Sequence, residues 1–423
     1  MGRFDADRAV ERGVRAEQRG DVGAAERAYR EVLARDPRHA GAHAQLGGLL
    51  AQSGRLEAAL PHLEAARDGR PGDRSPRNNL GHVYRELGRL REAEAVFAEL
   101  VAEEPAGWAL YGLGVTRQQS GDLAGARQAL TRAVAAGFSY GRLALAAVEE
   151  LEGRPDRAIQ TLTSALAEST HVGTPGRVRC RLGVLHVFHG NRAVGVAMLR
   201  AALQDDPSDA IARHMLAAVT GEAPEHAPDA FVAEVFDHFA AGYDTHLRDV
   251  LETRVPDWVA GATDLRGSVL DLGCGTGLAV RALGDRAERA VGVDLSPRMV
   301  QIARQSGLYA EVHCASLTDW LAGSTERFDL VLAADVLVYV GALEGLFAAV
   351  RPVCAGRFVL TVEAGEPDLV LCPTGRYAHG RAYVERCAVQ AGFSVQSVES
   401  GPLRKEAGSW VDGALYVLAP TDR

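Results

Sequence analysis

The sequence has few cysteines, almost no lysine and no long apolar segment. Six Cys residues among 423 are too few for a disulfide-stapled scaffold. A membrane-spanning helix needs about 20 consecutive apolar residues, and the longest apolar run, Leu330 to Val340, is interrupted by Asp335. We therefore expect no membrane partner. Lys405 is the single lysine among 46 basic residues, and we interpret the surplus of arginine as a coding bias.

Positive charge is also scarce, because 55 Asp+Glu outnumber 46 Lys+Arg and leave a net charge of −9. The deficit is uneven: residues 1–222 carry 29 basic and 28 acidic side chains, whereas residues 223–423 carry 17 and 27. A negative surface repels phosphates, so nucleic acid is not an expected partner. Hydrophobic residues make up 47% of the chain, which excludes a disordered protein and is typical of a globular one.

The length suggests two to three domains, at about 100–200 residues per domain. The first residues, Met1 to Ala6, lack the apolar region of a secretory signal and the Ser/Thr of a myristoylation motif. We therefore expect a cytoplasmic protein whose cysteines are reduced thiols.

A 34-residue period runs through the first half of the chain. Two glycines, an alanine and a proline recur in phase, in the columns Gly13/Gly47/Gly81, Gly20/Gly54/Gly88, Ala25/Ala59/Ala93 and Pro37/Pro71/Pro105. A large apolar residue follows each alanine by four positions, as Tyr29, Leu63 and Phe97. The first glycine permits close helix packing, the second permits a turn with positive φ, and the proline ends the second helix. The pattern resembles the tetratricopeptide repeat, a helix–turn–helix unit.

The period loosens farther along the chain but continues. Three more units are indicated by Gly114/Gly121/Ala126/Leu130, Gly153/Ala158/Leu162 and Gly183/Gly190/Leu199/Pro207. A helix over 209–219 is expected to cap the array, and the segment 221–228 is typical of a linker. We therefore predict a helical array of about six repeats over 1–222 and a second domain over 229–423.

Several roles for the repeat array remain open. Such arrays present a concave groove that binds peptides or protein surfaces, so the array could recruit a substrate or a protein partner. It could equally mediate self-association or brace the second domain. His186 and His189 lie at i, i+3 on a repeat helix, but no third ligand is near in sequence. Packing is the favoured interpretation of this pair, and we expect no metal site.

The second half carries a glycine loop between a predicted strand and a predicted helix. The strand covers 269–272, and the loop that follows contains Gly273, Gly275 and Gly277. A loop of this kind lets backbone amides contact a ligand directly. Leu278 stands where a dinucleotide-binding loop needs another glycine, which argues against NAD.

Two acidic residues accompany this loop. Asp271 lies two residues before its first glycine, and Asp294 ends a second predicted strand over 290–294. An acid at the second position can bind both hydroxyls of a ribose. The loop and the two acids together resemble the class I S-adenosylmethionine-dependent methyltransferases.

The resemblance implies an all-α repeat solenoid followed by an α/β Rossmann-like domain with a seven-stranded sheet. The expected strands cover 269–272, 290–294, 309–314, 328–333, 357–363, 393–399 and 414–419. Helices over 343–350 and 381–391 fit the expected alternation of strands and helices. The segment 231–247 adds one or two helices, and in this class such a segment often closes over the ligand.

The resemblance also assigns cofactor-binding roles, residue by residue. The three loop glycines would border the methionine part of S-adenosylmethionine, and Asp271 would hold the loop and reach the amino group. Asp294 would take the ribose hydroxyls. Segment 236–244 resembles quinone-pathway and malonyl-carrier-protein methyltransferases. Five further residues would lie at the cofactor: Leu295, Ser316 and Leu317 at the adenine, Tyr243 at the carboxylate, and Asp335 at the methyl group.

Catalysis needs mainly alignment of the acceptor with the S–CH3 bond, and a hydroxyl acceptor usually also needs a base. Our catalytic candidates are Asp335, Tyr377 and His379, which follow strands four and five, where open α/β sheets bind ligands. Tyr377 and His379 stand in an expected loop before a helix, and packing or capping is an equal alternative for them. Arg376 and Arg404 could hold an acidic substrate, although surface exposure is the default expectation.

Over nearly its whole length the chain resembles bacterial proteins that join tetratricopeptide repeats to such a domain, and this resemblance does not imply the acceptor. We expect methyl transfer from S-adenosylmethionine to an O or N atom of a small metabolite or a peptide. The alternatives are methylation of a folded protein bound by the repeats, and a non-catalytic adaptor that senses the cofactor. The stretch 333–337 reads Ala-Ala-Asp-Val-Leu rather than Asn/Asp-Pro-Pro-Tyr, which disfavours adenine, cytosine and glutamine as acceptors.

Overall fold

The computed structural model describes residues 5–167, 175–222, 224–239, 243, 247, 251–366, 368–406 and 409–421. The chain forms two compact units, residues 1–173 and residues 174–423. No helix within the described ranges is long and apolar enough to span a bilayer. The domain limits expected from the sequence, 1–222 and 229–423, stay a prediction, and the compact units divide the chain at a different place.

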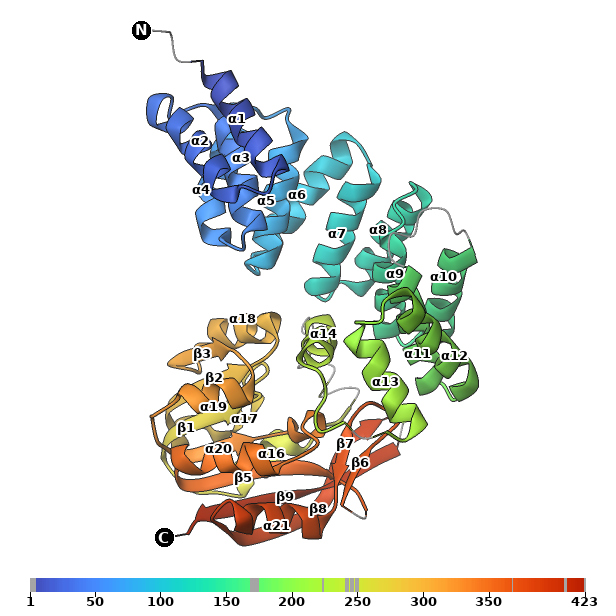
Figure 1. Ribbon diagram of the computed structural model, residues 1–423, viewed down its shortest axis with the longest axis vertical. Coiled ribbons are helices and arrows are strands. Elements are labelled where there is room, and N and C mark those ends of the chain that lie inside the picture. The colour runs from blue at the N-terminus through green and yellow to red at the C-terminus, as the bar shows by residue number, and fades with distance from the viewer. Residues whose placement is uncertain are drawn as a thin grey trace. The chain divides into compact units, whose positions relative to one another are not determined.

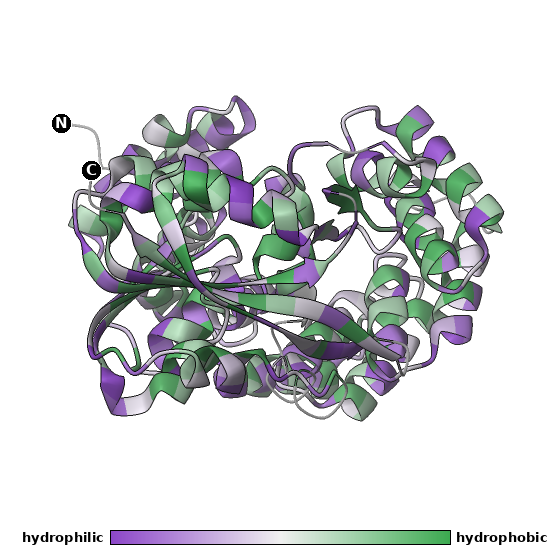
Figure 2. Cartoon of the chain, turned by 90° about the horizontal axis from the view of Figure 1, so that it is seen from below, coloured by the Kyte–Doolittle hydropathy of each residue, from purple (hydrophilic) through white to green (hydrophobic). Residues whose placement is uncertain are grey.

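The first unit consists of helices in which each helix packs against the next (Figure 1). The helices visible in Figure 2 carry both hydrophilic and hydrophobic residues, as expected for helices with one buried face. The helices are α1 Ala6–Gln18, α2 Val22–Arg35, α3 Ala40–Gln52, α4 Leu56–Gly69, α5 Arg74–Glu86, α6 Leu90–Glu103, α7 Gly107–Gln119, α8 Leu123–Ala135, α9 Gly141–Leu151 and α10 Pro155–Ala167.

The first glycine column marks where paired helices touch. A Cβ atom on Gly47 of α3 would lie 2.7 Å from Cγ of Leu63 in α4, and Leu63 is fully buried. The same contact recurs at each period, between Gly13 and Tyr29 and between Gly81 and Phe97. The large apolar residue after each alanine therefore packs on the glycine of the partner helix, and the tetratricopeptide-like fold predicted from the period is confirmed.

The second unit begins with three more helices of the array. They are α11 Pro175–Phe188, α12 Arg192–Asp205 and α13 Ala210–Thr220, followed by α14 Asp229–Phe239. Their apolar side chains share one buried cluster with residues of the α/β domain, including Met215, Phe231, Tyr339, Leu371 and Tyr377. The capping helix α13 thus packs against the α/β domain, and the last helical pair belongs to the same apolar cluster within one compact unit.

The α/β domain is built on one mixed sheet (Figure 1). The strand order is β3-β2-β1-β4-β5-β7-β6, and β9 pairs with β5 and β8. Strands β1 to β5 run parallel to one another, whereas β9 is antiparallel to β5 and β8. The strands are β1 Gly267–Leu272, β2 Ala287–Asp294, β3 Glu311–Cys314, β4 Phe328–Ala333, β5 Cys354–Ala364, β6 Leu369–Leu371, β7 Tyr377–His379, β8 Phe393–Glu406 and β9 Ser409–Pro420.

Within the described residues the sheet has nine strands, so the expected number of seven is wrong. The additional strands are β6 and β7, each three residues long, which is too short to show an alternating pattern in the sequence. Strand β4 stops at Ala333, opposite Leu360, whereas β5 continues to Ala364. The last residues of β5 pair with β7, which satisfies backbone groups beyond the end of β4.

Helices cover both faces of the sheet. Leu270 packs in a core with α19, α20 and α21, whereas its neighbour Val269 packs in a core with α16 and α17. Successive residues of a strand point to opposite faces, so the apolar run of β1 serves both cores. The helices are α16 Val255–Gly261, α17 Leu278–Leu283, α18 Pro297–Gln305, α19 Leu317–Gly323, α20 Glu344–Val353 and α21 Arg381–Gln390.

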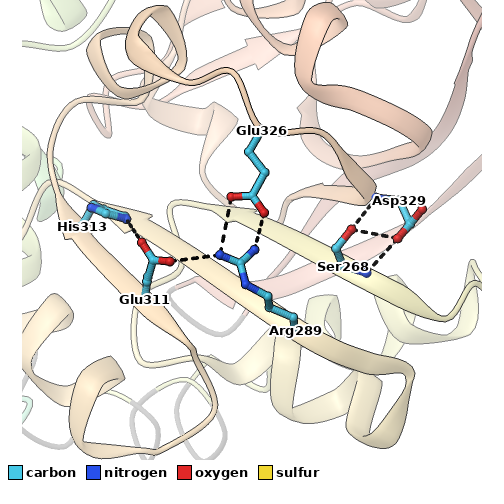
Figure 3. Close-up of polar contacts among 6 residues, drawn as sticks. All are labelled: Ser268, Arg289, Glu311, His313, Glu326 and Asp329. Carbon is cyan, nitrogen blue, oxygen red and sulfur yellow. Dashed lines mark hydrogen bonds and ion pairs between the residues drawn. The ribbon is translucent and has the colours of Figure 1, made fainter.

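Polar contacts join the amino ends of the strands (Figure 3). The backbone N–H and the hydroxyl of Ser268 in β1 both donate to Asp329 Oδ2 in β4, at 2.9 and 2.8 Å. Arg289 of β2 pairs with Glu311 of β3 and with Glu326, just before β4. These contacts support the strand register at the end of the sheet opposite the glycine loop.

Candidate active site

A cavity of about 500 Å³ opens at the carboxyl ends of β1, β2 and β4. This volume lies within the range of small-molecule sites. The glycine loop, α14 and the segment that precedes α14 contribute to its lining. Nine of the residues predicted for the cofactor line it: Tyr243, Asp271, Gly273, Gly275, Asp294, Leu295, Ser316, Leu317 and Asp335.

The glycine loop places backbone directly at the cavity. Gly273, Gly275 and Gly277 all have positive φ, at +71°, +51° and +96°, which glycine adopts at little cost. A Cβ atom on Gly273 would lie 2.3 Å from Cγ2 of Val336, so this position has no room for a side chain. Gly277 begins the turn into α17 and is not part of the cavity lining.

Asp271 is the buried acid of this loop. Only 1% of its surface is exposed, and its Oδ2 accepts a hydrogen bond of 2.7 Å from the Tyr309 hydroxyl. Burial raises the pKa of Asp271 to about 6, and the bond from Tyr309 acts in the opposite direction. We expected Tyr309 only as the first residue of a strand, and no signal in the sequence connects it to Asp271.

Asp294 has both carboxylate oxygens engaged by backbone. Oδ2 accepts from the Gly275 N–H at 2.9 Å, and Oδ1 accepts from the Ser296 N–H at 2.8 Å. Burial raises the pKa of Asp294, and these backbone donors oppose the rise. The end of β2 is therefore tied to the glycine loop through one side chain.

The turn that follows β2 also anchors α14. The Ser296 hydroxyl donates to Asp237 Oδ1 at 2.5 Å, and the Met299 N–H donates to the Ser296 oxygen at 3.1 Å. Asp237 thus ties α14 to the turn after β2, and no pattern in the sequence assigns it this role. The expected segment 236–244 contains it, and residues 240–242 and 244 of that segment lie outside the described residues.

Aromatic side chains form one wall of the cavity. Phe236 packs edge-on against Tyr243 and Tyr339, with ring centroids 6.0 and 5.3 Å apart. Burial raises the pKa of Tyr243 well above its usual value. Its phenol is therefore neutral at physiological pH.

Leu295, Ser316 and Leu317 line the cavity after β2 and β3, as predicted by position. Ser316 is the N-cap of α19, and its Oγ accepts from the Asp319 N–H at 3.2 Å. The cap explains why a serine is compatible with this position, because its hydroxyl satisfies a free N–H of the helix.

Asp335 lies just after β4 with a φ of +54°, an uncommon conformation for a residue other than glycine. Its Oδ1 accepts from Arg404 at 2.7 Å, and the same guanidinium donates to Glu363 Oε2 at 2.8 Å. Arg404 is 1% exposed, so the expectation of a surface arginine is wrong. The Asp335 N–H donates to Thr361 at 2.9 Å, and these contacts hold the carboxylate in place.

The structure does not bring Tyr377 and His379 to the cavity, where we expected catalytic side chains. They belong to β7 rather than to a loop, and both are buried. The Tyr377 hydroxyl donates to the Pro224 carbonyl at 2.8 Å. His379 Nε2 lies 3.0 and 2.9 Å from the carbonyls of Val340 and Gly341. Both side chains therefore support backbone that lies behind the cavity wall.

The expected linker is itself part of this wall. Its Glu225 carbonyl accepts from the Ala342 N–H at 2.7 Å, and its Ala227 N–H donates to the Tyr339 carbonyl at 3.1 Å. Glu225 and His226 line the cavity. No pattern in the sequence indicates this role, because Pro and Gly near 221–228 indicate only a break between helices.

The sequence matches known families in both halves of the chain. The methyltransferase domain family matches residues 269–355. Two tetratricopeptide repeat families match residues 10–74, 111–171 and 50–111.

Several of the named relatives are methyltransferases. Magnesium-protoporphyrin O-methyltransferase of Rhodobacter capsulatus is 35% identical over 116 residues, 26% of this chain and 48% of the relative. Ubiquinone biosynthesis O-methyltransferase of Xanthomonas oryzae is 35% identical over 89 residues, 20% of this chain and 37% of the relative. The enzyme of that name from Thiobacillus denitrificans is 27% identical over 192 residues, 39% of this chain and 83% of the relative.

The alignments thus span less than half the length of the first two relatives. The family matches identify both halves independently of these relatives. The chain joins tetratricopeptide repeats to a class I S-adenosylmethionine-dependent methyltransferase domain.

Proposed function

We propose that this protein transfers a methyl group from S-adenosylmethionine to an O or N atom of a small metabolite or a peptide. The observation that carries the proposal is the convergence of Asp271, the glycine loop and Asp294 on one cavity. Open α/β sheets bind ligands at this end of their strands.

The residues present fit the cofactor. Gly275 lines the cavity, and a Cβ atom there would lie 3.9 Å from the Tyr243 ring, so a ligand can approach the backbone of the loop closely. Asp271 offers a buried carboxylate for an ammonium group, and Asp294 stands at the end of β2 for the ribose hydroxyls. Leu295 and Leu317 supply apolar surface for a purine ring.

S-adenosylmethionine, when bound, supplies a methyl group already activated by its positive sulfur. The chain then has to orient the acceptor and exclude water, which can account for a large part of the rate. Asp335 can accept a hydrogen bond from an acceptor N–H or O–H, and Arg404 holds it in place. Phe236, Tyr243 and Tyr339 can pack against an apolar or aromatic acceptor.

The charge of the lining favours an acceptor without negative charge. Six of the lining residues carry carboxylates, and no lysine or arginine occurs among the lining residues that the structure describes: the acids are Glu225, Asp229, Asp271, Asp294, Asp319 and Asp335. An anionic acceptor would meet repulsion here. The names of the relatives describe O-methyltransferases, which favours oxygen as the accepting atom.

For the repeat array we propose that it recruits the substrate or a protein partner, or mediates self-association. The support is its family, because repeat arrays use extended surfaces for binding. Two alternative functions follow from this: methylation of a folded protein held by the repeats, and a cofactor-sensing adaptor without turnover.

Calorimetry with S-adenosylmethionine and a methyl-label screen test the proposal. The full chain should bind S-adenosylmethionine. It should also transfer the methyl label to a component of a lysate fraction from which folded proteins have been removed by filtration. Labelling confined to folded proteins would instead support the protein-methyltransferase alternative. Binding without any labelled product would support the adaptor, and absence of binding would contradict all three functions.

A further inference from the structure

Tyr309 fills a space beneath the glycine loop that two glycines leave open. It lies between α18 and β3, and its hydroxyl donates to Asp271 at 2.7 Å. A Cβ atom on Gly277 would lie 3.0 Å from its ring, and one on Gly292 would lie 3.1 Å from it. The ring is also part of the apolar contacts around Cys274. Packing therefore fixes the place from which the phenol O–H reaches Asp271.

Asp271 has one oxygen taken by this contact. Oδ2 accepts from Tyr309, and the residue lines the cavity although only 1% of its surface is exposed. A ligand in the cavity can therefore approach this carboxylate. An ammonium group bound there needs an ionised carboxylate, because a protonated one offers no countercharge.

Apart from Tyr309, the groups around Asp271 favour its neutral, protonated form. Burial raises the pKa of Asp271, the Tyr309 hydrogen bond lowers it and the Asp294 carboxylate raises it, and the resulting value is about 6. Cys274 carries no compensating charge, because burial raises the pKa of its thiol and keeps it neutral. On the neighbouring strand β4, Leu332 stands opposite Asp271.

We propose that Tyr309 is a positioning residue of the cofactor site, whose hydroxyl keeps Asp271 ionised to bind the cationic amino group of S-adenosylmethionine. The proposal rests on the proposed function. Neither the family motif nor the spacing of the loop assigns a role to this tyrosine.

The test is calorimetry of the full chain and its Tyr309→Phe variant with S-adenosylmethionine between pH 5.5 and 8.5. The variant keeps the ring between the glycines and loses only the hydroxyl. If the pKa of Asp271 rises by one unit, affinity at pH 6 falls about fivefold, and the difference shrinks toward pH 8.5. Tyr416→Phe is the matched control, because Tyr416 is a 1% exposed tyrosine on β9 of the same domain.

A second ligand separates charge from packing. 5′-Methylthioadenosine lacks the amino acid end, so Tyr309→Phe should bind it as the unaltered chain does at pH 6. An equal loss at every pH, an equal loss for both ligands, or no loss for S-adenosylmethionine would overturn the role of Tyr309. Failure of the unaltered chain to bind S-adenosylmethionine would instead overturn the proposed function.

Discussion

Two carboxylates at the cavity, those of Asp294 and Asp335, have oxygens fixed by hydrogen bonds from the protein. Asp294 is held by the backbone of Gly275 and Ser296, and Asp335 is held by Arg404. A ligand therefore meets acceptor atoms whose direction is already set. Such preorganisation reduces the entropy lost on binding.

Replacement of Asp294 by alanine should weaken S-adenosylmethionine binding at least tenfold, or about 1.4 kcal/mol, because a bidentate contact to the ribose is lost. The loop loses a partner as well, since the Gly275 N–H donates to this side chain. Calorimetry measures the effect. Glu311→Ala, at the amino end of the sheet in Figure 3, removes an acid without approaching the cavity and serves as the control. An unchanged affinity for Asp294→Ala would place the ribose elsewhere.

Replacement of Arg404 by methionine should lower the free energy of unfolding by about 3–5 kcal/mol, because two carboxylates are then left partly buried without their shared cation. These are Asp335 and Glu363, with 21% and 14% of their side chains exposed. Urea unfolding measures the change. Arg381→Met breaks the exposed pair with Glu385 and should cost less than about 1 kcal/mol. Equal effects of the two variants would refute the structural importance of the buried cation.

At the scale of elements, short strands and their hydrogen bonds decide where the predicted catalytic side chains lie. Tyr377 and His379 were expected in a loop, but pairing with β5 and β6 turns them into β7. On α13, His214 Nε2 lies 2.8 Å from the carbonyl of Gly375 in the β6–β7 connection, beside which Figure 1 places α13. These histidines join elements of the second unit rather than reaching the cavity.

The two histidines make stability depend on pH. Burial lowers the pKa of His214 and of His379, and the buried Nδ1 of each has no partner among the described residues. Below the unfolded pKa of about 6.5, the unfolded chain binds more protons than the folded chain. The free energy of unfolding should therefore decrease as the pH falls through that value. Thermal unfolding from pH 8 to pH 6 measures this.

Between pH 8 and pH 6, the free energy of unfolding of the His379→Asn variant should depend less on pH than that of the unaltered chain. Asp271 has the opposite effect on the free energy of unfolding, because its pKa is raised to about 6 in the folded chain. Protonation of Asp271 stabilises the folded state at low pH, and this stabilisation is lost as the pH rises through about 4 to 6. The window between pH 6 and 7 is therefore dominated by the imidazoles. A slope that is unchanged in His379→Asn would show that this histidine is not the titrating group.

At the scale of the whole molecule, the compact units do not follow the boundary suggested by the repeats. The second unit begins at residue 174. The apolar cluster that α11 to α14 share with the α/β domain contains Met215, Phe231, Tyr339 and Tyr377. Tyr339 also lines the cavity, so these helices contribute to the surroundings of the site.

A fragment of residues 174–423 should therefore fold and bind S-adenosylmethionine like the full chain. A fragment of residues 223–423 lacks α11 to α13, so Leu371 and Tyr377 would lose their cover and the fragment should aggregate. Size-exclusion chromatography followed by calorimetry compares the two. A soluble 223–423 fragment with full affinity would show that the repeats do not stabilise the α/β domain.

The sequence by itself determined the helical repeats, the α/β class, the glycine loop and the two acids of the loop. These features depend on local patterns: a 34-residue period, alternating strands and helices, and a loop whose glycines need positive φ. Only the tertiary structure decided which side chains contact one another at the site. Tyr309 contacts Asp271 across 38 positions, Ser296 contacts Asp237 across 59, and Arg404 contacts Asp335 across 69. Contacts between residues this far apart in the sequence form only when distant strands and helices pack together, so no local pattern predicts them.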